Sequence, residues 1–247
     1  MTQKNRICFV SIDVEHDLRD GERTFAGVEN LNSLLSLFRK YSIPATLFVT
    51  GEVLKKYSNL VKKWGEDYEI ASHGYSHEFW NTLTPEQREK ELREFVDLYK
   101  SIFQKPPVGF RAPSHVMDEQ GMELVRKTGF LYDSSVVPHY PPLKKYRGYK
   151  GRAPLQPYKP AEADILELPN TGQLMGIPLV GTWIRKLPLA FYKILFLLHK
   201  PRFVSLSMHS WDSLHPDFYW KLEEIIKILK KDNYTFLNGK QILENRK

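Results

Sequence analysis

The chain has 247 residues, of which 42% are hydrophobic and 26% are charged, and this is the composition of an ordinary globular protein. Its single cysteine, Cys8, excludes an intrachain disulfide, and no run approaches the roughly 18 apolar residues of a membrane-spanning helix. The net charge of +7 favours an anionic partner, such as a phosphate, a nucleic acid, an acidic lipid or an acidic glycan, without choosing among them.

Strand-like and helix-like segments alternate along the chain. In chain order, the patterns predict a strand at 7–13, a helix at 31–41, strands at 45–50 and 69–72, a helix at 84–103, a strand at 108–111, a helix at 119–127, strands at 130–133, 165–168 and 203–207, and helices at 214–231 and 240–244. The helix at 84–103 has the clearest start, because Thr84 is a typical N-cap, Pro85 suits the first turn and Gln87 occupies the capping-box position. The alternation predicts an α/β protein with a mainly parallel sheet, either open or closed into a barrel.

Residues 138–160 interrupt this alternation. They are rich in proline, glycine, tyrosine and lysine and show no period, so they predict a long irregular surface loop of a kind that is often functional. We expect one domain over residues 1–247, because α/β barrels of this length are commonly undivided. The first six residues are polar and show no signal-peptide pattern, so we expect a cytoplasmic protein, which could also associate with a membrane surface.

Polar residues follow four of the predicted strands, at the rim where active sites form in α/β barrels. These residues are 13–17, 72–77, 111–114 and 207–212. The spacing of His73 and His77 would place both imidazoles on one side of a helical turn, within reach of one metal ion. Glu15 could supply a carboxylate as the third ligand. The alternative is that both are ordinary surface or hydrogen-bonded histidines.

Asp13 and Glu15 would repel each other at a strand end unless something binds beside them. A metal ion on Glu15 would leave Asp13 free to accept a proton from water. The alternative is that the two carboxylates cap a loop or pair with Arg19, Arg23 or a lysine.

His209 and Arg111 each follow a predicted strand, and each has a structural and a functional interpretation. His209 could protonate a leaving amine, since histidine donates protons near neutral pH, or it could be a satisfied core histidine. Arg111 could hold Asp13 through a bidentate contact and keep it charged, or it could simply join two loops.

Taken together, these motifs occur in an order that resembles the polysaccharide deacetylases, also called NodB-homology or carbohydrate esterase family 4 proteins. Residues 11–15, Ser-Ile-Asp-Val-Glu, stand where the family has T-F-D-D, and they are similar to its D-x-E variant subgroup. The other matching motifs are His73 to His77, Arg111-Ala112-Pro113 and Leu206 to His209. Residues 132–135 stand at the fourth motif but lack its usual tryptophan.

The resemblance implies an α/β fold, a distorted (β/α) barrel of about seven strands. It implies that Asp13 is the catalytic base and His209 the catalytic acid. It further implies that Arg111 orients Asp13 and that Asp133 orients His209.

The resemblance also implies one divalent metal ion, with Zn²⁺ favoured over Co²⁺, Ni²⁺, Mn²⁺ and Fe²⁺ by the expected ligands. These ligands are Glu15, His73 and His77, and Asp17 is a weaker candidate in place of Glu15. Substrate would be contacted by Leu206, at the acyl methyl group, and by Pro113 and Trp211.

The implied reaction is metal-dependent removal of an acetyl or formyl group from the nitrogen of an amino sugar, in a glycan or a lipid-linked saccharide of the cell envelope. Residues 187–198 are strongly apolar and have basic neighbours, so they predict either an ordinary barrel helix or an interfacial helix at the inner membrane face. The alternatives are a metal-free hydrolase of a small cyclic amide or ureide and a non-catalytic glycan-binding protein. No nucleic-acid motif is present in the sequence, so we expect no such partner.

Overall fold

One long buried strand is the centre of the fold. The computed structural model describes residues 6–19, 22–138, 153–161, 163–171 and 178–246, with the backbone alone described for Leu18 and Arg19. Strand β1 (Arg6–Val14) has seven consecutive buried residues, from Cys8 to Val14. A strand buried on both faces in this way must have neighbours on both edges and layers on both sides.

The remaining strands are short and mostly buried. They are β2 (Asp17–Arg19), β3 (Glu22–Thr24), β4 (Thr46–Val49), β5 (Glu69–Ser72), β6 (Gly109–Phe110), β7 (Tyr132–Asp133), β8 (Leu166–Glu167), β9 (Phe203–His209) and β10 (Tyr234–Leu237). The α-helices are α1 (Ala26–Glu29), α2 (Leu31–Lys40), α3 (Gly51–Lys56), α4 (Ser58–Asp67), α5 (Pro85–Phe103), α6 (Glu119–Lys127), α7 (Gly181–Lys186), α8 (Leu189–Leu198), α9 (Pro216–Lys231) and α10 (Gly239–Glu244).

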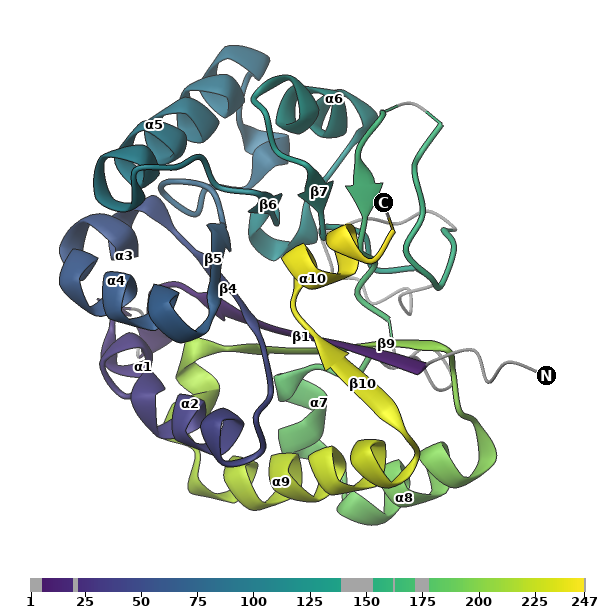
Figure 1. Cartoon of the computed structure of the whole chain (residues 1–247). Helices are drawn as coiled ribbons and strands as arrows, with labels where there is room; N and C mark the ends of the chain where they lie inside the picture. Colours follow the sequence, from purple (N-terminus) through teal and green to yellow (C-terminus); the bar gives the residue numbers. More distant parts are fainter. Residues whose placement is uncertain (1–5, 20–21, 139–152, 162, 172–177, 247) are drawn as a thin grey trace.

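The main sheet is parallel and runs β10-β1-β4-β5-β6-β7-β8, with β9 on the other edge of β1. β10 pairs with the first half of β1 and β4 with the second half, which lets the sheet curl into a partial barrel surrounded by helices (Figure 1). Past β8 the chain returns toward β9, where the Ser205 amide donates to the Thr171 carbonyl at 2.9 Å. The predicted distorted (β/α) barrel is confirmed, with eight described strands in this sheet.

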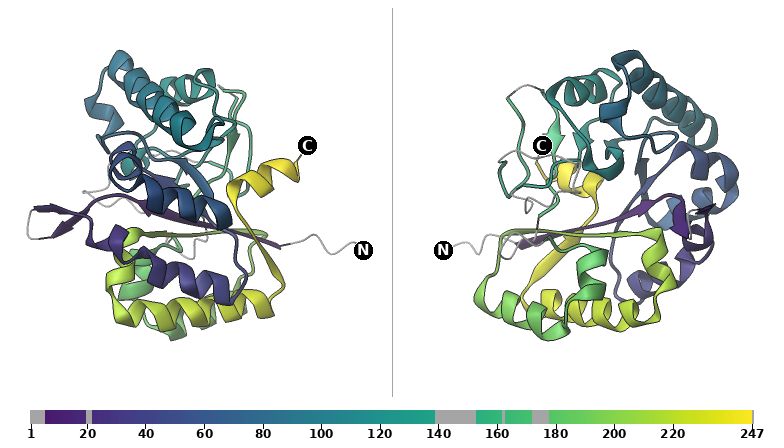
Figure 2. Two further views of the ribbon diagram at one scale, coloured as in Figure 1. Left: turned by 60° about the vertical axis from the view of Figure 1, so that its left-hand side comes forward. Right: turned by 180° about the vertical axis from the view of Figure 1, so that it is seen from behind.

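The helices turn apolar faces toward the sheet. α2 buries Leu31, Leu34, Leu35 and Phe38 among others, at the spacing that predicted it. α9 likewise buries an apolar stripe, and its basic residues lie on the exposed side. The N-terminus of α5 has the predicted capping box between Thr84 and Gln87, with Pro85 in the first turn. In Figure 2 the helices lie on both sides of β1.

Several elements were missing from the sequence prediction. These are the β2–β3 hairpin, β10 and helices α1, α3, α4 and α7. Most of the loop predicted at 138–160 lies outside the described residues, and residues 153–161 contain no helix or strand apart from an isolated bridge between Tyr158 and Glu167. No helix in the described ranges is long and apolar enough to cross a membrane.

Candidate metal and catalytic site

The register of the sheet places the strand-end residues at one rim. Asp13 on β1 lies directly beside His209 on β9. On the other side, Ser72 at the end of β5 pairs with Phe110 at the end of β6, so His73 and Arg111 follow side by side. These four residues are far apart in the sequence, and the parallel pairing of their strands brings them to the same rim.

A possible set of metal ligands lies at this rim. One ligand atom each from Glu15, His73 and His77 lies within 4.8 Å of the others. The His73 Nε2 atom is 3.2 Å from the Glu15 Oε2 atom, and the His77 Nε2 atom contacts the same oxygen. Glu15 and His73 are almost fully buried, and His77 is 15% exposed. The structure therefore brings together the three residues that the sequence had suggested as ligands.

The histidines do not lie on a helical turn, so this part of the prediction was wrong. Residues 73–77 form an irregular loop in which Gly74 has a φ of 73° and His77 a φ of 63°. The loop is held by the Glu91 carboxylate of α5, which accepts hydrogen bonds from the Tyr75 and Ser76 amides at 2.9 Å each and from the Ser76 hydroxyl at 2.7 Å. Glu91 was not identified from the sequence, because only the tertiary fold brings α5 to this loop.

The hydrogen bonds of the two buried ligands fit a cation. The His73 Nδ1 atom donates to the Arg111 carbonyl oxygen at 2.9 Å, so a neutral His73 ring presents its Nε2 lone pair to Glu15. The Glu15 Oε2 atom is buried and has no hydrogen-bond partner among the described residues. Lone pairs that face one another in a buried space are stabilised by a positive ion between them. Two imidazoles and one carboxylate suit Zn²⁺ and related divalent ions.

Asp17, the weaker candidate for a ligand, lies elsewhere. Its carboxylate accepts hydrogen bonds from the Thr24 hydroxyl and, at 3.1 Å, from the Gly27 amide at the start of α1. Asp17 therefore joins the β2–β3 hairpin to α1 and is not among the candidate ligands.

Asp13 and Arg111 form a buried ion pair. The Arg111 Nη1 atom donates to the Asp13 Oδ1 atom at 2.7 Å and to the Ser207 hydroxyl at 3.0 Å, while the other guanidinium nitrogens donate to the Ser134 carbonyl and hydroxyl oxygens. The predicted contact exists, but it is a single hydrogen bond and not a bidentate one. Burial raises the pKa of Asp13, but the nearby positive charge, chiefly that of Arg111, outweighs burial and holds this pKa below its usual value. Asp13 is therefore ionised.

His209 is positioned by its own neighbours on the chain. Its ring stacks on Trp211, with centroids 4.2 Å apart and an interplanar angle of 9°. Its Nε2 atom lies 3.9 Å from the Glu15 Oε1 atom, and its Nδ1 atom lies 4.0 Å from the Asp212 Oδ2 atom. Asp212 is fully buried and also accepts a hydrogen bond from the His209 amide at 2.9 Å.

Asp133 does not orient His209, contrary to the prediction. Its carboxylate accepts hydrogen bonds from the Ser135 hydroxyl at 2.7 Å and the Ser135 amide at 3.1 Å. Asp133 and Glu167 hydrogen-bond to each other, and burial raises the pKa of both. The pKa of Glu167 is raised well above its usual value. Asp212 is the carboxylate beside His209, and its spacing three residues after His209 was the signal that the sequence offered.

The three predicted substrate contacts have different surroundings. Leu206 is fully buried in the apolar core, so its placement does not support a contact with the acyl group. Pro113 is also buried and packs near Gly74 in the loop of the two histidines. Trp211 is partly exposed and lines a cavity of about 440 Å³ together with Glu15, His16, Asp17, His77, Arg185, Leu214 and His215. This cavity opens directly on the candidate ligands.

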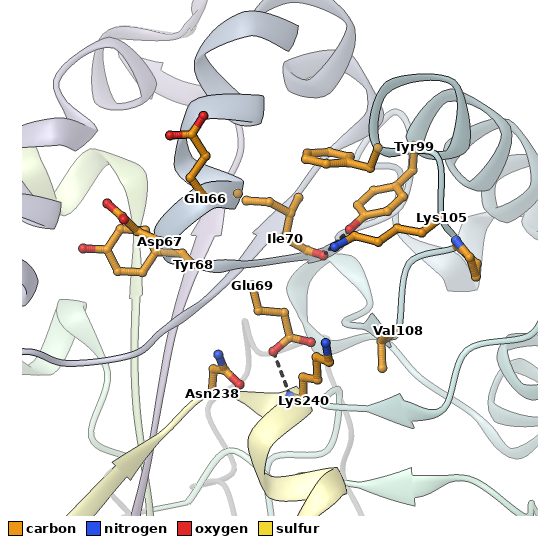
Figure 3. A pocket seen from close by; sticks show the side chains of 13 residues that line it. Glu66, Asp67, Tyr68, Glu69, Ile70, Tyr99, Lys105, Val108, Asn238 and Lys240 are labelled. Atoms are coloured by element: carbon orange, nitrogen blue, oxygen red, sulfur yellow. Dashed lines mark hydrogen bonds between the residues drawn. The ribbon is translucent and has the colours of Figure 1, made fainter.

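A second cavity, of about 240 Å³, lies at the opposite rim, where β5 begins (Figure 3). Its buried carboxylate, Glu69, accepts hydrogen bonds from the Thr46 hydroxyl at 2.7 Å, from the Tyr132 hydroxyl at 2.9 Å and from the Lys240 amide at 2.9 Å. Glu69 thus joins three strands to α10, and both of its oxygens are occupied. We assign this cavity a structural role.

His115 is a further residue near the site that sequence reasoning missed. It follows the Arg111 motif and interacts electrostatically with Arg111 and Asp13. Burial, reinforced by the Arg111 charge, lowers the pKa of His115 to about 3, so this imidazole is neutral at physiological pH.

Known proteins resemble this chain in sequence and in fold. A family model described as polysaccharide deacetylase matches residues 20–132. The peptidoglycan deacetylase of Helicobacter pylori is 32% identical over 179 residues, which are 68% of this chain and 61% of that protein. The chain spans less than two thirds of the length of the curated relatives that it matches.

Two solved structures share the fold. A Mycobacterium smegmatis protein, provisionally assigned to the polysaccharide deacetylases, has a TM-score of 0.72 and 21% identity, over 99% of this chain and 92% of that one. Puue allantoinase has a TM-score of 0.70 and 17% identity, over 99% and 91% of the two chains. At these identities the likeness concerns the fold alone. The matching family model and the Helicobacter relative, together with this fold, show that the chain contains a polysaccharide deacetylase domain.

Proposed function

We propose that the protein is a metal-dependent hydrolase that removes an acetyl or formyl group from the nitrogen of an amino sugar in a glycan. The observation that carries the proposal is the convergence of Glu15, His73 and His77 beside the ion-paired carboxylate of Asp13. The name of the Helicobacter relative, a peptidoglycan deacetylase, supports a glycan of the cell envelope as the substrate class. In this proposal the carboxylate ligand is Glu15, the last residue of the D-x-E form of the first motif.

Each side chain at the rim has a role in this reaction. Asp13 is ionised and accepts the proton of the attacking water. Arg111 fixes the direction of the Asp13 carboxylate, which would otherwise be free to rotate. His209, backed by Trp211, protonates the departing sugar nitrogen. No covalent acyl-enzyme is required by these roles.

Glu15, His73 and His77 would hold the divalent ion, with Zn²⁺ favoured by this ligand set. When bound, the ion supplies Lewis-acid polarisation of the acyl carbonyl. The Arg111 carbonyl oxygen accepts from the far side of the His73 ring and so fixes both its tautomer and its orientation.

The cavity beside the ligands supports a sugar-sized substrate. Its volume of about 440 Å³ lies within the usual range for small-molecule sites. Trp211 offers an apolar ring surface against which a sugar can pack, and Arg185 and His215 offer polar contacts. The same features would accept a free glycan or the sugar of a lipid-linked saccharide.

Metal content and amide hydrolysis, measured on the same samples, test the proposal. We expect near one divalent ion per wild-type chain and none in the His73→Ala/His77→Ala double variant, while the control His199→Ala, an exposed histidine, keeps its metal. Release of acetate or formate from N-acyl amino sugars should follow the metal content. Hydrolysis of a cyclic ureide without bound metal would favour the metal-free alternative, and glycan binding without any hydrolysis would favour a binding protein.

A further inference from the structure

Helix α8 is apolar on two opposite faces. Its inner face buries Tyr192, Leu195 and Phe196 against the core. Its outer face exposes Ile194, Leu197 and Leu198 by 54%, 75% and 77%, and these are half of the large apolar side chains that are strongly exposed among the described residues. Packing against the core explains why the inner face of α8 is apolar, but it does not explain why the outer face is apolar. A helix that is apolar all round normally lies in a core or in contact with lipid.

The sequence around α8 is strongly basic. Between Glu167 and Asp212 there are five lysine and arginine residues and no acidic residue. Lys193, Lys200 and Arg202 are all exposed and lie on or just after α8. Within the described part of the chain, neither Lys193 nor Arg202 forms an ion pair.

A groove of about 400 Å³ between α8 and α9 combines these two properties. Phe196, Leu197 and Ile228 provide its apolar wall, and Lys193, Lys200 and Lys231 provide its charge. Its lining includes one acid, Asp232, which pairs with Lys200. In Figure 1, α8 and α9 lie side by side at the outer edge of the molecule, so that their outward faces are free to meet a flat surface.

We propose that the outer face of α8 binds an anionic membrane surface. Ile194, Leu197 and Leu198 enter the interfacial region, and Lys193, Lys200 and Lys231 contact the lipid phosphates. The combination of exposed aliphatic side chains with a local excess of cations distinguishes this partner from a neutral protein surface, which would leave Lys193 and Lys231 without counter-charges. The helix lies flat on the membrane and does not cross it.

This contact is independent of the proposed hydrolysis. α8 leads into the first residue of β9, Phe203, whereas the metal and catalytic residues lie beyond the last residue, His209. The exposed leucines at the end of α8 are therefore at the opposite rim from the site. A variant of the α8 surface should leave turnover of a water-soluble substrate unchanged.

Vesicle co-sedimentation of the full chain tests the proposal. One set of vesicles is phosphatidylcholine alone, and the other contains equal parts of phosphatidylcholine and phosphatidylglycerol. The variants are Leu197→Ser/Leu198→Ser and Lys193→Gln/Lys231→Gln, and Leu131→Ser is the matched control because Leu131 is 50% exposed away from α8. Thermal unfolding of each variant shows whether it is folded.

We expect the wild-type chain to bind the anionic vesicles, to bind the neutral ones much less, and to lose binding as salt is added. The double leucine variant should bind the anionic vesicles about tenfold more weakly or worse. In the double lysine variant, each of the two substitutions should weaken this binding about fivefold. The Leu131 control should bind like the wild type. Absence of binding to anionic vesicles, or binding that the α8 variants leave unchanged, would overturn the proposal. So would a wild-type dimer that the leucine variant converts to a monomer, because the face would then cover a second copy of the chain.

Discussion

The Arg111 Nη1 atom lies 2.7 Å from the Asp13 Oδ1 atom, with the two side chains 0% and 4% exposed. Breaking such a pair on one side leaves a buried charge without a partner, which typically costs about 3–5 kcal/mol. Arg111→Gln should therefore lower the free energy of unfolding by roughly this amount, and urea denaturation would measure it. The loss should also include the hydrogen bonds that Arg111 donates to Ser134 and Ser207.

The double variant Asp13→Asn/Arg111→Gln is the control for this pair. It removes both charges, and asparagine has nearly the same volume as aspartate, so the double variant should regain part of the stability lost in Arg111→Gln. If the double variant were as unstable as the sum of the two single variants, the pair would not be coupled and the buried-charge explanation would fail.

Asp13→Asn by itself should abolish hydrolysis while the protein remains folded, because asparagine can still accept the hydrogen bond from Arg111 but cannot take up a proton. Circular dichroism and turnover of an N-acyl amino sugar would be measured on the same sample. Normal turnover by this variant would exclude Asp13 as the base.

Glu91 should control metal affinity without being a ligand. Its three hydrogen bonds to Tyr75 and Ser76 hold the loop that carries both histidines. Loss of an outer contact of this kind typically weakens metal binding by about 10–100-fold, so Glu91→Ala should do the same in a titration with Zn²⁺. Glu94→Ala is the control, because Glu94 is an exposed residue of the same helix and its one ion-pair partner among the described residues is Lys90. Equal affinities in the two variants would show that the loop does not need Glu91.

His209→Ala should lower kcat by roughly 10²–10⁴-fold with a smaller effect on KM, as expected for loss of a proton donor. Asp212→Asn should lower kcat less than this, because the imidazole that donates the proton remains and only the carboxylate charge beside it is removed. Asp133→Asn should leave kcat close to the wild-type value, because Asp133 contacts Ser135 and Glu167 instead of His209. A larger loss of kcat in Asp133→Asn than in Asp212→Asn would restore the assignment made from the sequence.

The sequence predicted the rim and its residue types, because polar residues after apolar strands are visible without coordinates. Parallel strands carry their ends to one rim, so Asp13, His73, Arg111 and His209 had to lie near one another once the barrel was assumed. Short elements such as α4 were not predicted, since Val61 and Trp64 are its only buried residues in the described structure and make a weak pattern.

Contacts that depend on the tertiary fold could not be predicted from the sequence. The turn of the two histidines depends on positive φ angles at Gly74 and His77, whereas their spacing by itself indicated a helix. The partner of His209 could not be chosen by motif position, because Asp133 and Asp212 are both strand-end carboxylates and only the packing separates them. A helix with a buried face was among the interpretations of residues 187–198, and α8 has such a face. The apolar outer face of this helix could be recognised only from the three-dimensional structure.

Glu167 should make the stability of the protein depend on pH. Burial, reinforced by the Asp133 charge, raises the pKa of Glu167 well above its usual value. Protonated Glu167 therefore contributes stability that is complete below its pKa in the unfolded chain and is lost as the pH rises through its pKa in the folded protein. Between these two values the wild type loses up to about 1.4 kcal/mol of unfolding free energy per pH unit from this group.

Glu167→Gln mimics the protonated side chain at every pH and can still accept the hydrogen bond from the Val136 amide. The variant should thus match the wild type in acid and become increasingly more stable than it as the pH rises. Urea denaturation over a series of pH values would measure this difference, with Glu94→Gln as an exposed control that should show almost none. A stability difference for Glu167→Gln that stays constant with pH would mean that Glu167 is ionised in the folded protein and that its pKa is not raised.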